Sequence, residues 1–219
     1  MMRAVILVSG GMDSCVTAAM AKNDGFQVCF LHLNYGQRTE DRELKAFHDI
    51  ADFYDVKDRL VIDMSHFTQI GGSCLTDHKI NVPISDLEKK DIPISYVPFR
   101  NANILSAATS WADVLGATAL YIGAVEEDSS GYPDCRRSFY DAFEKTIEEG
   151  TKPETYIKII TPLIKFSKKE IISKGDALNA PINLSWSCYE REDRPCGTCD
   201  SCVLRARGFS QAGILDPII

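Results

Sequence analysis

The chain of 219 residues carries 24 lysines and arginines against 31 aspartates and glutamates, which gives a formal net charge of −7. Hydrophobic residues make up 45% of the sequence and charged residues 25%, a balance typical of globular proteins. This length predicts one large domain with room for a small appendage, since a domain has roughly 150 residues. The acidic balance disfavours DNA or RNA as the main ligand, because phosphate polymers are attracted to basic surfaces.

The sequence contains no apolar run near the roughly 20 residues that cross a bilayer, so we expect no membrane-spanning segment. The first apolar run, residues 4–8, stops at Ser9 and is also too short for a signal peptide. We therefore expect a cytoplasmic protein whose eight cysteines stay reduced, because disulfides are uncommon in that compartment. Four of these cysteines crowd between Cys188 and Cys202, a density that indicates a metal site.

Apolar runs and helical periodicity alternate along the chain. Residues 65–97 break this rhythm with glycines and prolines and are expected to form a long functional loop. The alternation predicts an α/β fold: a doubly wound, mainly parallel five-stranded sheet with helices on both faces, in residues 1–180. Residues 181–219 are expected to form a small C-terminal metal-binding tail packed on it.

In chain order, the expected elements are strand 3–8, helix 14–24 closed by Gly25, strand 27–33, helix 38–54, strand 60–64, helix 101–115, strand 120–123, helix 136–149, strand 157–160, and helix 167–174 with a capping box of Ser167 and Glu170.

A glycine-rich segment, Ser9–Ser14, follows the first predicted strand and precedes the first helix. In an open α/β sheet this is where ligands bind, and two adjacent glycines allow the backbone N–H groups to approach an anion. Asp13 beside an anion suggests either a Mg²⁺ contact or a helix cap. The segment lacks both G-x-x-x-x-G-K-[ST] and G-x-G-x-x-G, which disfavours two common nucleotide folds. A turn that only caps a helix is the competing interpretation.

The letters SGGMDS in this segment resemble the S-G-G-x-D-S signature of the PP-loop ATP pyrophosphatases, the adenine nucleotide alpha hydrolase superfamily. The resemblance implies that the loop holds the β,γ-pyrophosphate of ATP, while a substrate oxygen attacks the α-phosphate to give an adenylate. It also implies Mg²⁺ as the companion of ATP. The expected nucleotide-binding residues are Val8, Ser9, Gly10, Gly11, Met12, Asp13 and Ser14.

Four cysteines form the pattern Cys188-x7-Cys196-x2-Cys199-x2-Cys202, with Pro195 and Gly197 available for tight turns. Four thiolates suit a tetrahedral structural zinc ion, one per chain, which would pin the tail to the domain. An iron–sulfur cluster is the alternative, since C-x2-C-x2-C also occurs in ferredoxins, although the Cys-Pro that follows there is missing here.

Two basic residues are expected near the nucleotide. Arg100 opens a predicted helix at the same sheet edge as the glycine-rich segment and could neutralise a phosphate or carboxylate. Lys165 follows a turn after the fifth predicted strand, within a locally basic stretch. With Asp13, these two residues are our catalytic candidates.

The polar loop at residues 123–136 offers carboxylates to a guanine-like edge. Asp134 and Arg136 are the substrate-binding candidates, and Glu127 and Asp128 are weaker ones because solvated loop acids are common. Cys135 has no histidine nearby in the sequence that would activate it as a nucleophile, so we assign it no role.

Beyond the loop and the cysteines, the sequences YGQ at 35–37, PFRN at 98–101 and GYPDCR at 131–136 resemble the 7-cyano-7-deazaguanine synthase family of queuosine precursor biosynthesis. The resemblance runs nearly end to end and implies a homodimer. It also implies that the enzyme adenylates the carboxylate of 7-carboxy-7-deazaguanine and lets ammonia displace AMP to form an amide. A second ATP then activates the amide oxygen, whose loss leaves a nitrile. No glutaminase cysteine–histidine pair is evident, which favours free ammonia as the nitrogen source.

Two other interpretations stay open. One is a tRNA-thiolating enzyme of the same superfamily, against which the acidic charge counts. The other is a zinc-ribbon interaction module on a nucleotide-sensing domain without catalysis.

Overall fold

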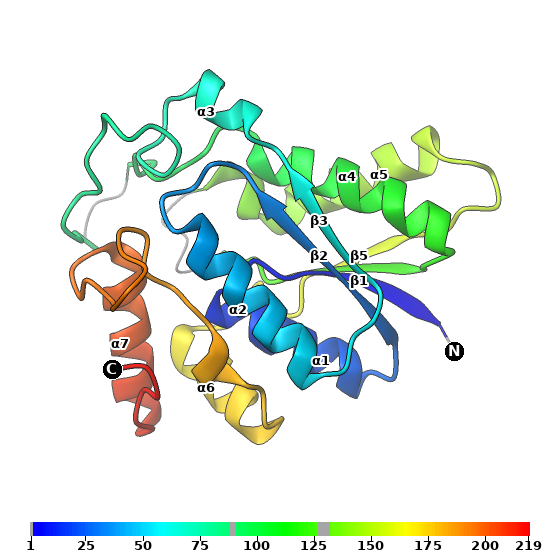
Figure 1. The fold of residues 1–219 in the computed structure, drawn as a ribbon. Helices are drawn as coiled ribbons and strands as arrows, with labels where there is room; N and C mark the ends of the chain where they lie inside the picture. The colour runs from blue at the N-terminus through cyan, green and yellow to red at the C-terminus, as the bar shows by residue number, and fades with distance from the viewer. Residues whose placement is uncertain (1, 88–90, 127–131) are drawn as a thin grey trace.

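A computed structural model describes residues 2–87, 91–126 and 132–219 (Figure 1). Its centre is a fully parallel five-stranded sheet in the order β3-β2-β1-β4-β5, which confirms the predicted fold class. The strands are β1 (Arg3–Leu7), β2 (Gln27–Asn34), β3 (Arg59–Asp63), β4 (Ala119–Ile122) and β5 (Lys158–Ile160).

β1 lies at the middle of the sheet because its continuous apolar sequence can be covered on both faces. Its Leu7 pairs with Leu31 of β2 on one side and with Ile122 of β4 on the other. The chain order reverses between β1 and β4, which makes the carboxyl end of β1 a topological switch point. A ligand crevice is expected at this edge.

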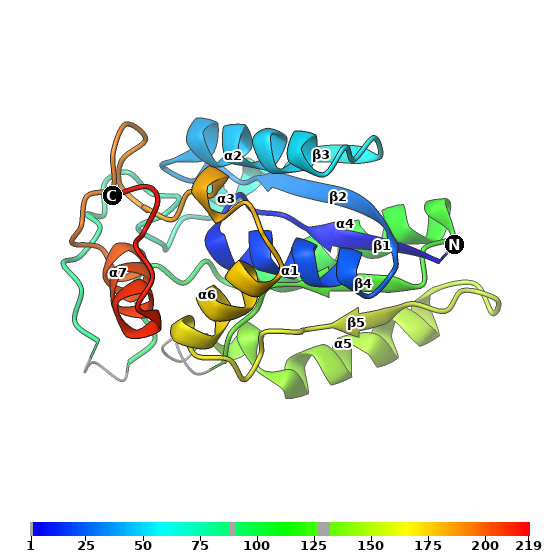
Figure 2. The same cartoon turned by 90° about the horizontal axis from the view of Figure 1, so that it is seen from below.

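Two pairs of helices cover the two faces of the sheet (Figure 2). α1 (Met12–Asn23) and α2 (Glu40–Phe53) pack on the face formed by Ala4 and Ile6, and α4 (Arg100–Leu115) and α5 (Arg137–Gly150) on the face formed by Val5 and Leu7. Alternation of side chains along a strand divides β1 in this way. α1 begins two residues earlier than predicted, and Gly25, with φ of +85°, ends it as expected.

The part of the chain after β5 contains more regular structure than the sequence indicated. α6 (Lys168–Ala177) begins with the predicted capping box of Ser167 and Glu170, a short 3₁₀ turn covers Ile182–Leu184, and α7 (Asp200–Ala212) is a helix that we did not predict. Phe209 of α7 is buried against Ile171 and Ile172 of α6. The apolar contact between the two helices therefore anchors the tail, in addition to any metal.

In its described residues, 65–87 and 91–97, the segment at 65–97 contains one short helix, α3 (His66–Ile70), and is otherwise irregular, close to the expectation. It is held in place by Arg38, whose guanidinium donates hydrogen bonds of 2.7, 3.2 and 2.6 Å to the carbonyls of Cys74, Asp77 and Ile80. A second short 3₁₀ turn covers Pro133–Cys135. Among the described residues, no helix combines the length and the apolar character that crossing a bilayer requires.

Candidate active site

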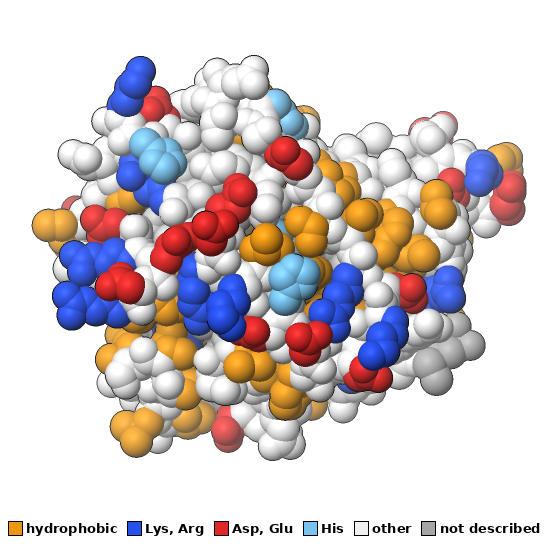
Figure 3. All heavy atoms as spheres, in the orientation of Figure 1, with side chains coloured by type: hydrophobic (Ala, Val, Ile, Leu, Met, Phe, Trp, Pro, Cys, Tyr) orange, Lys and Arg blue, Asp and Glu red, His pale blue; other side chains and the backbone are white. Residues whose placement is uncertain are grey.

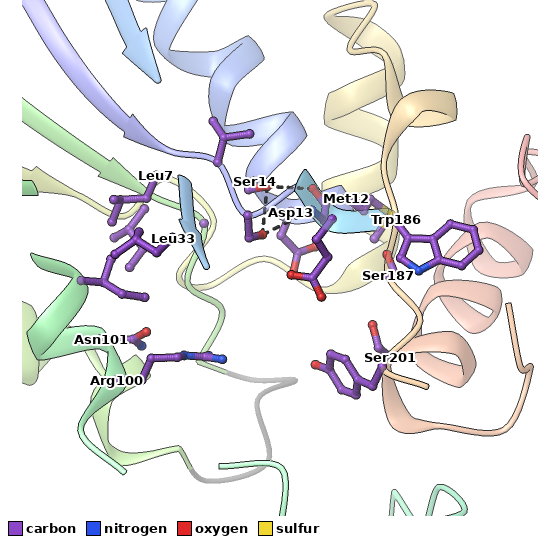
Figure 4. A pocket seen from close by; sticks show the side chains of 18 of the residues that line it. Leu7, Met12, Asp13, Ser14, Leu33, Arg100, Asn101, Trp186, Ser187 and Ser201 are labelled. Carbon is purple, nitrogen blue, oxygen red and sulfur yellow. Dashed lines mark hydrogen bonds between the residues drawn. The ribbon is translucent and has the colours of Figure 1, made fainter. Parts of the chain in front are cut away.

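A cavity of about 270 Å³ opens at the carboxyl edge of the sheet, where the switch point predicts a ligand. Figure 4 shows three walls that come from distant parts of the chain. The loop after β1 forms the first wall, the start of α4 with Arg100 and Asn101 forms the second, and the tail with Trp186 and Ser201 forms the third.

The glycine-rich loop has the geometry of an anion cradle. Gly11 N–H donates to Ser9 Oγ at 3.3 Å, Ser9 Oγ lies 3.2 Å from Ser14 Oγ, and the Ser14 hydroxyl donates to the Gly11 carbonyl at 2.9 Å. No side chain caps the N-terminus of α1, so its first N–H groups are available to a ligand. Of the seven predicted nucleotide-binding residues, all line the cavity except Gly10, which has a φ of +89° and lies against the backbone of Glu43 in α2. The loop residues that line it are Val8, Ser9, Gly11, Met12, Asp13 and Ser14.

Asp13 and a lysine that the sequence analysis missed form an ion pair in this cavity. Lys168 Nζ lies 2.7 Å from Asp13 Oδ2, and both residues line the cavity. Asp13 Oδ1 is buried and has no hydrogen-bond partner among the described residues. Lys165, our predicted lysine, is exposed and is not part of the lining. The structure therefore brings Lys168 to the cavity and leaves Lys165 outside it.

Arg100 extends from the N-terminus of α4 into the cavity (Figure 4). Its Nη1 donates a 3.0 Å hydrogen bond to the Tyr35 hydroxyl, and its guanidinium carbon lies 5.2 Å from the centre of the Tyr35 ring. A phenol neutralises no charge, so the guanidinium keeps its full charge for an anionic substrate group. The structure thus places Arg100 where the sequence predicted it.

The two predicted substrate-binding residues, Asp134 and Arg136, do not line the cavity. Asp134 is buried and accepts a 3.1 Å hydrogen bond at Oδ2 from the backbone N–H of Asn101, so it orients the start of α4. The Asn101 side chain returns a 2.9 Å hydrogen bond to the Asp134 carbonyl. Arg136 is exposed, and Glu127 and Asp128 lie outside the described residues.

Glu43 of α2 also lines the cavity and was missed. Its carboxylate accepts hydrogen bonds from the Thr39 hydroxyl at 2.7 Å and from Gln37 Nε2 at 3.2 Å. Burial raises the pKa of Glu43 to about 7, although these two hydrogen bonds lower it. The signal in the sequence is an acid on the apolar stripe of the helix, at helical spacing from the buried Phe47 and Ile50.

The tail supplies an aromatic and hydroxyl-rich wall, through Trp186, Ser187, Tyr189 and Ser201. The backbone N–H of Trp186 donates a 2.8 Å hydrogen bond to the carbonyl of Gly10, which ties the tail to the glycine-rich loop. Ser187 and Tyr189 directly flank the cysteine ligand candidate Cys188 in the chain. The cysteine cluster therefore sets the position of this wall.

The four predicted ligand sulfurs converge. The Sγ atoms of the four tail cysteines all lie within 4.8 Å of one another, and those of Cys196 and Cys202 are 3.9 Å apart. A tetrahedral ion with metal–sulfur bonds of about 2.3 Å separates its ligands by about 3.8 Å. Backbone N–H groups of Glu190, Arg191 and Cys196 approach Cys188 Sγ at 3.4 Å, as donors to a thiolate do. The four cysteines thus have a geometry that could hold a metal ion.

Comparisons with known proteins agree with this geometry. The family model of "Queuosine biosynthesis protein QueC" matches residues 3–213. Proteins named 7-cyano-7-deazaguanine synthase from Chlorobaculum parvum and Chloroherpeton thalassium are each 58% identical over 217 residues, covering 99% of this chain and 96% of each relative. A solved 4-thiouridine synthetase in complex with RNA and ATP shares the fold, with a TM-score of 0.55 at 17% identity over 95% of this chain and 53% of its own. The chain belongs to the QueC family of queuosine biosynthesis proteins.

Proposed function

We propose that this protein is an ATP-dependent ligase that converts 7-carboxy-7-deazaguanine and ammonia to 7-cyano-7-deazaguanine. The observation that carries the proposal is that the glycine-rich loop and Arg100, which has no acidic partner at ion-pair distance among the described residues, lie on two walls of one cavity, in a member of this family. The substrate carboxylate attacks the α-phosphate of ATP and pyrophosphate leaves. Ammonia then displaces AMP to give the amide. A second ATP activates the amide oxygen, and loss of AMP and of the nitrogen-bound protons leaves the nitrile.

The residues of the loop, 8–14, would hold ATP through backbone N–H groups and the hydroxyls of Ser9 and Ser14. Asp13 would hold Mg²⁺ through Oδ1, the buried oxygen without a partner, while Lys168 keeps Oδ2 in place. Bound Mg²⁺ supplies charge neutralisation on the polyphosphate. Lys168 would place a positive charge beside the leaving pyrophosphate. It takes the place near the nucleotide at which the sequence analysis expected Lys165.

Arg100 would pair with the substrate carboxylate and then with the charge that develops on the α-phosphate. Tyr132 and Tyr189 line the same cavity and offer flat surfaces to a bicyclic base. Asp134 would act through Asn101, by fixing the start of α4 and with it Arg100. Direct substrate contacts of Asp134 and Arg136 stay predictions.

We propose zinc as the metal of the four cysteines, one ion per chain in a structural role. Four thiolates saturate a tetrahedral site and leave no open position for chemistry. Metal analysis with visible absorption distinguishes zinc, which is colourless, from an iron–sulfur cluster.

We further propose a cytoplasmic homodimer that acts on small molecules rather than on nucleic acid. Eight free cysteines suit a reducing compartment. The net charge is −7, and on the face drawn in Figure 3 acidic side chains lie among the basic ones. Light scattering coupled to gel filtration tests the dimer, which the family resemblance implies.

Turnover tests the proposed function. Purified protein is incubated with ATP, Mg²⁺, ammonium and 7-carboxy-7-deazaguanine, and AMP, pyrophosphate and the nitrile are followed by mass spectrometry. Nitrile formation with AMP release supports the synthase. ATP binding without any product would mean that the acceptor is wrong, and unmodified tRNA would then be assayed as the substrate.

A further inference from the structure

Two carboxylates line the cavity among the described residues, Asp13 and Glu43. Lys168 already pairs with Asp13. Glu43 pairs with no cation at ion-pair distance within the described part of the chain, and its contacts are the neutral side chains of Thr39 and Gln37. A carboxylate in a cavity wall with only neutral partners is suited to a small cation.

The hydrogen bonds around Glu43 fit both of its protonation states. The Oε1 atom of Gln37 accepts from the backbone N–H of Tyr35 at 2.9 Å, which turns the Nε2 donor of Gln37 toward Glu43. The Thr39 hydroxyl has one proton and two acceptors in reach, Glu43 Oε1 at 2.7 Å and the Cys188 carbonyl at 3.2 Å. When the hydroxyl donates to Cys188, its oxygen can accept a proton from Glu43. The carboxyl can therefore gain a proton without moving its neighbours.

The charged and titratable groups that act on Glu43 come from three elements. Arg100 of α4 favours its ionised form and Glu40 of α2 disfavours it, while Tyr35, after β2, shares the wall and hydrogen-bonds Arg100. Burial exceeds the other effects and raises the pKa of Glu43 to about 7. Near neutral pH, comparable fractions of the carboxyl are ionised and protonated.

The amination step needs such a group. Ammonia is present almost entirely as ammonium at neutral pH, and ammonium has no lone pair for attack. From the position of Glu43 in the cavity and its two hydrogen-bond states we propose that Glu43 binds ammonium and accepts one of its protons. This inference rests on the proposed function and assigns its nitrogen-binding group.

The step balances as follows. One N–H proton of ammonium passes to the Glu43 carboxylate, and the nitrogen lone pair forms the C–N bond to the acyl carbon of the adenylate. The C–O bond to the phosphate breaks, and AMP leaves with that electron pair. The second surplus proton passes to solvent, so that ammonium and the acyl adenylate give the amide, AMP and protonated Glu43.

The test separates adenylation from amination. In Glu43→Gln, pyrophosphate release from ATP and 7-carboxy-7-deazaguanine without ammonium should stay within about twofold of wild type, whereas kcat/KM for ammonium should fall about 100-fold or more. Asp41→Asn, an exposed acid-to-amide change in the first turn of the same helix, is the matched control and should keep both rates.

A second readout combines the rate of hydroxamate formation from hydroxylamine with the pH dependence of the rate with ammonium. Hydroxylamine is already uncharged at neutral pH, so Glu43→Gln should form the hydroxamate at the wild-type rate. With ammonium, the wild-type rate should level off above about pH 7, while the variant rate should keep rising about tenfold per pH unit, as the fraction of free ammonia does.

If Glu43→Gln loses as much rate with hydroxylamine as with ammonium, the proposed role of Glu43 is overturned. It is also overturned if kcat/KM for ammonium is unchanged in the variant. If the variant does not fold, the wild-type profiles decide: a rate with ammonium that rises to about pH 7 and then levels off, while the rate with hydroxylamine is already flat near neutral pH, supports the proposal. A rate with ammonium that keeps rising above about pH 7, as the fraction of free ammonia does, overturns it. Wild-type protein that makes no product from the deazaguanine acid refutes the proposed function itself, which keeps the two failures distinct.

Discussion

Lys168 and Asp13 lie 155 residues apart in the chain, yet the Nζ of the lysine is 2.7 Å from Oδ2 of the aspartate. The pair joins the first turn of α6 to the first turn of α1, and both side chains are mostly buried. The capping box of Ser167 and Glu170 fixes the turn that carries the lysine. One oxygen of Asp13 is thus oriented by the protein, and the other remains for a ligand.

Asp13→Asn should lower the rate of pyrophosphate release by about 100-fold or more, because the amide cannot replace a carboxylate beside Mg²⁺ and polyphosphate. The melting temperature should stay near that of wild type, since the side chain lies outside the apolar core and an amide oxygen can still accept the hydrogen bond from Lys168. Coupled detection of pyrophosphate checks the rate. Wild-type turnover in a folded Asp13→Asn protein would remove Asp13 from the site.

Lys168→Met should raise the KM for ATP at least about tenfold, because it removes a charge beside the pyrophosphate. Lys169→Met is the control: Lys169 is the next residue, carries the same charge and is exposed outside the cavity. Steady-state kinetics of both variants compares them directly. Similar KM values in the two variants would mean that the lysine at 168 serves only to hold Asp13 in the free protein.

Much of the fold could be predicted because its signals are local. The apolar runs of β1 and β2, and the helical periodicity of α2 and α4, are read within a dozen residues. The glycine-rich loop and the four cysteines are equally local. α7 was missed because the cysteine pattern dominated the interpretation of the tail, although Phe209 and Gly213 mark a buried helix face and a helix end.

The part of the site that could not be predicted from the sequence depends on contacts between distant segments. Lys165 and Lys168 are three residues apart and chemically identical, and only the packing of α6 against α1 decides which one reaches Asp13. Asp134 was predicted to bind substrate by residue type, but its Oδ2 accepts a hydrogen bond from the backbone of α4 and the residue is not part of the cavity lining. Glu43 stands out in the sequence as an acid on the apolar stripe of α2, but its place in the cavity depends on how α2 packs against the loop that follows β1.

Cys199→Ser should lose the bound metal and melt several degrees lower, since a saturated thiolate site contributes folding free energy. The effect should reach catalysis as a higher KM for the deazaguanine acid, because Tyr189 and Ser201 flank ligand cysteines and line the cavity. Cys29→Ser changes a buried thiol outside the cluster and should keep the full metal content. Metal analysis and thermal denaturation of both variants test this prediction. An unchanged melting temperature with full metal content in Cys199→Ser would reject the structural metal-binding role of the cysteines.

Glu43 should make the stability of the protein depend on pH. The pKa of its carboxyl is raised from 4.5 to about 7 in the folded protein, so between these values the unfolded chain is ionised while the folded one stays protonated. Ionisation then favours unfolding, and the free energy of unfolding should fall by roughly 3 kcal/mol as pH rises from 4.5 to 7. Urea denaturation at several pH values should show this fall in wild type relative to Glu43→Gln. Parallel curves for the two proteins would contradict the raised pKa.

Gly10→Ala tests whether the loop depends on the close approach of α2. At Gly10 φ is +89°, and a Cβ atom there would lie 2.4 Å from the carbonyl oxygen of Glu43, a backbone atom that cannot move without the helix. Backbone strain and overpacking together should cost about 3 kcal/mol of unfolding free energy. Gly25→Ala is a matched control, since φ is +85° but no atom lies within 4 Å of the added Cβ, so only the strain of about 1 kcal/mol remains. Denaturation and ATP binding measured on both variants separate backbone strain from overpacking against α2. If α2 sets the shape of the loop, Gly10→Ala alone should lose ATP affinity. Equal losses of unfolding free energy and of ATP affinity in the two variants would mean that backbone strain is the whole cause.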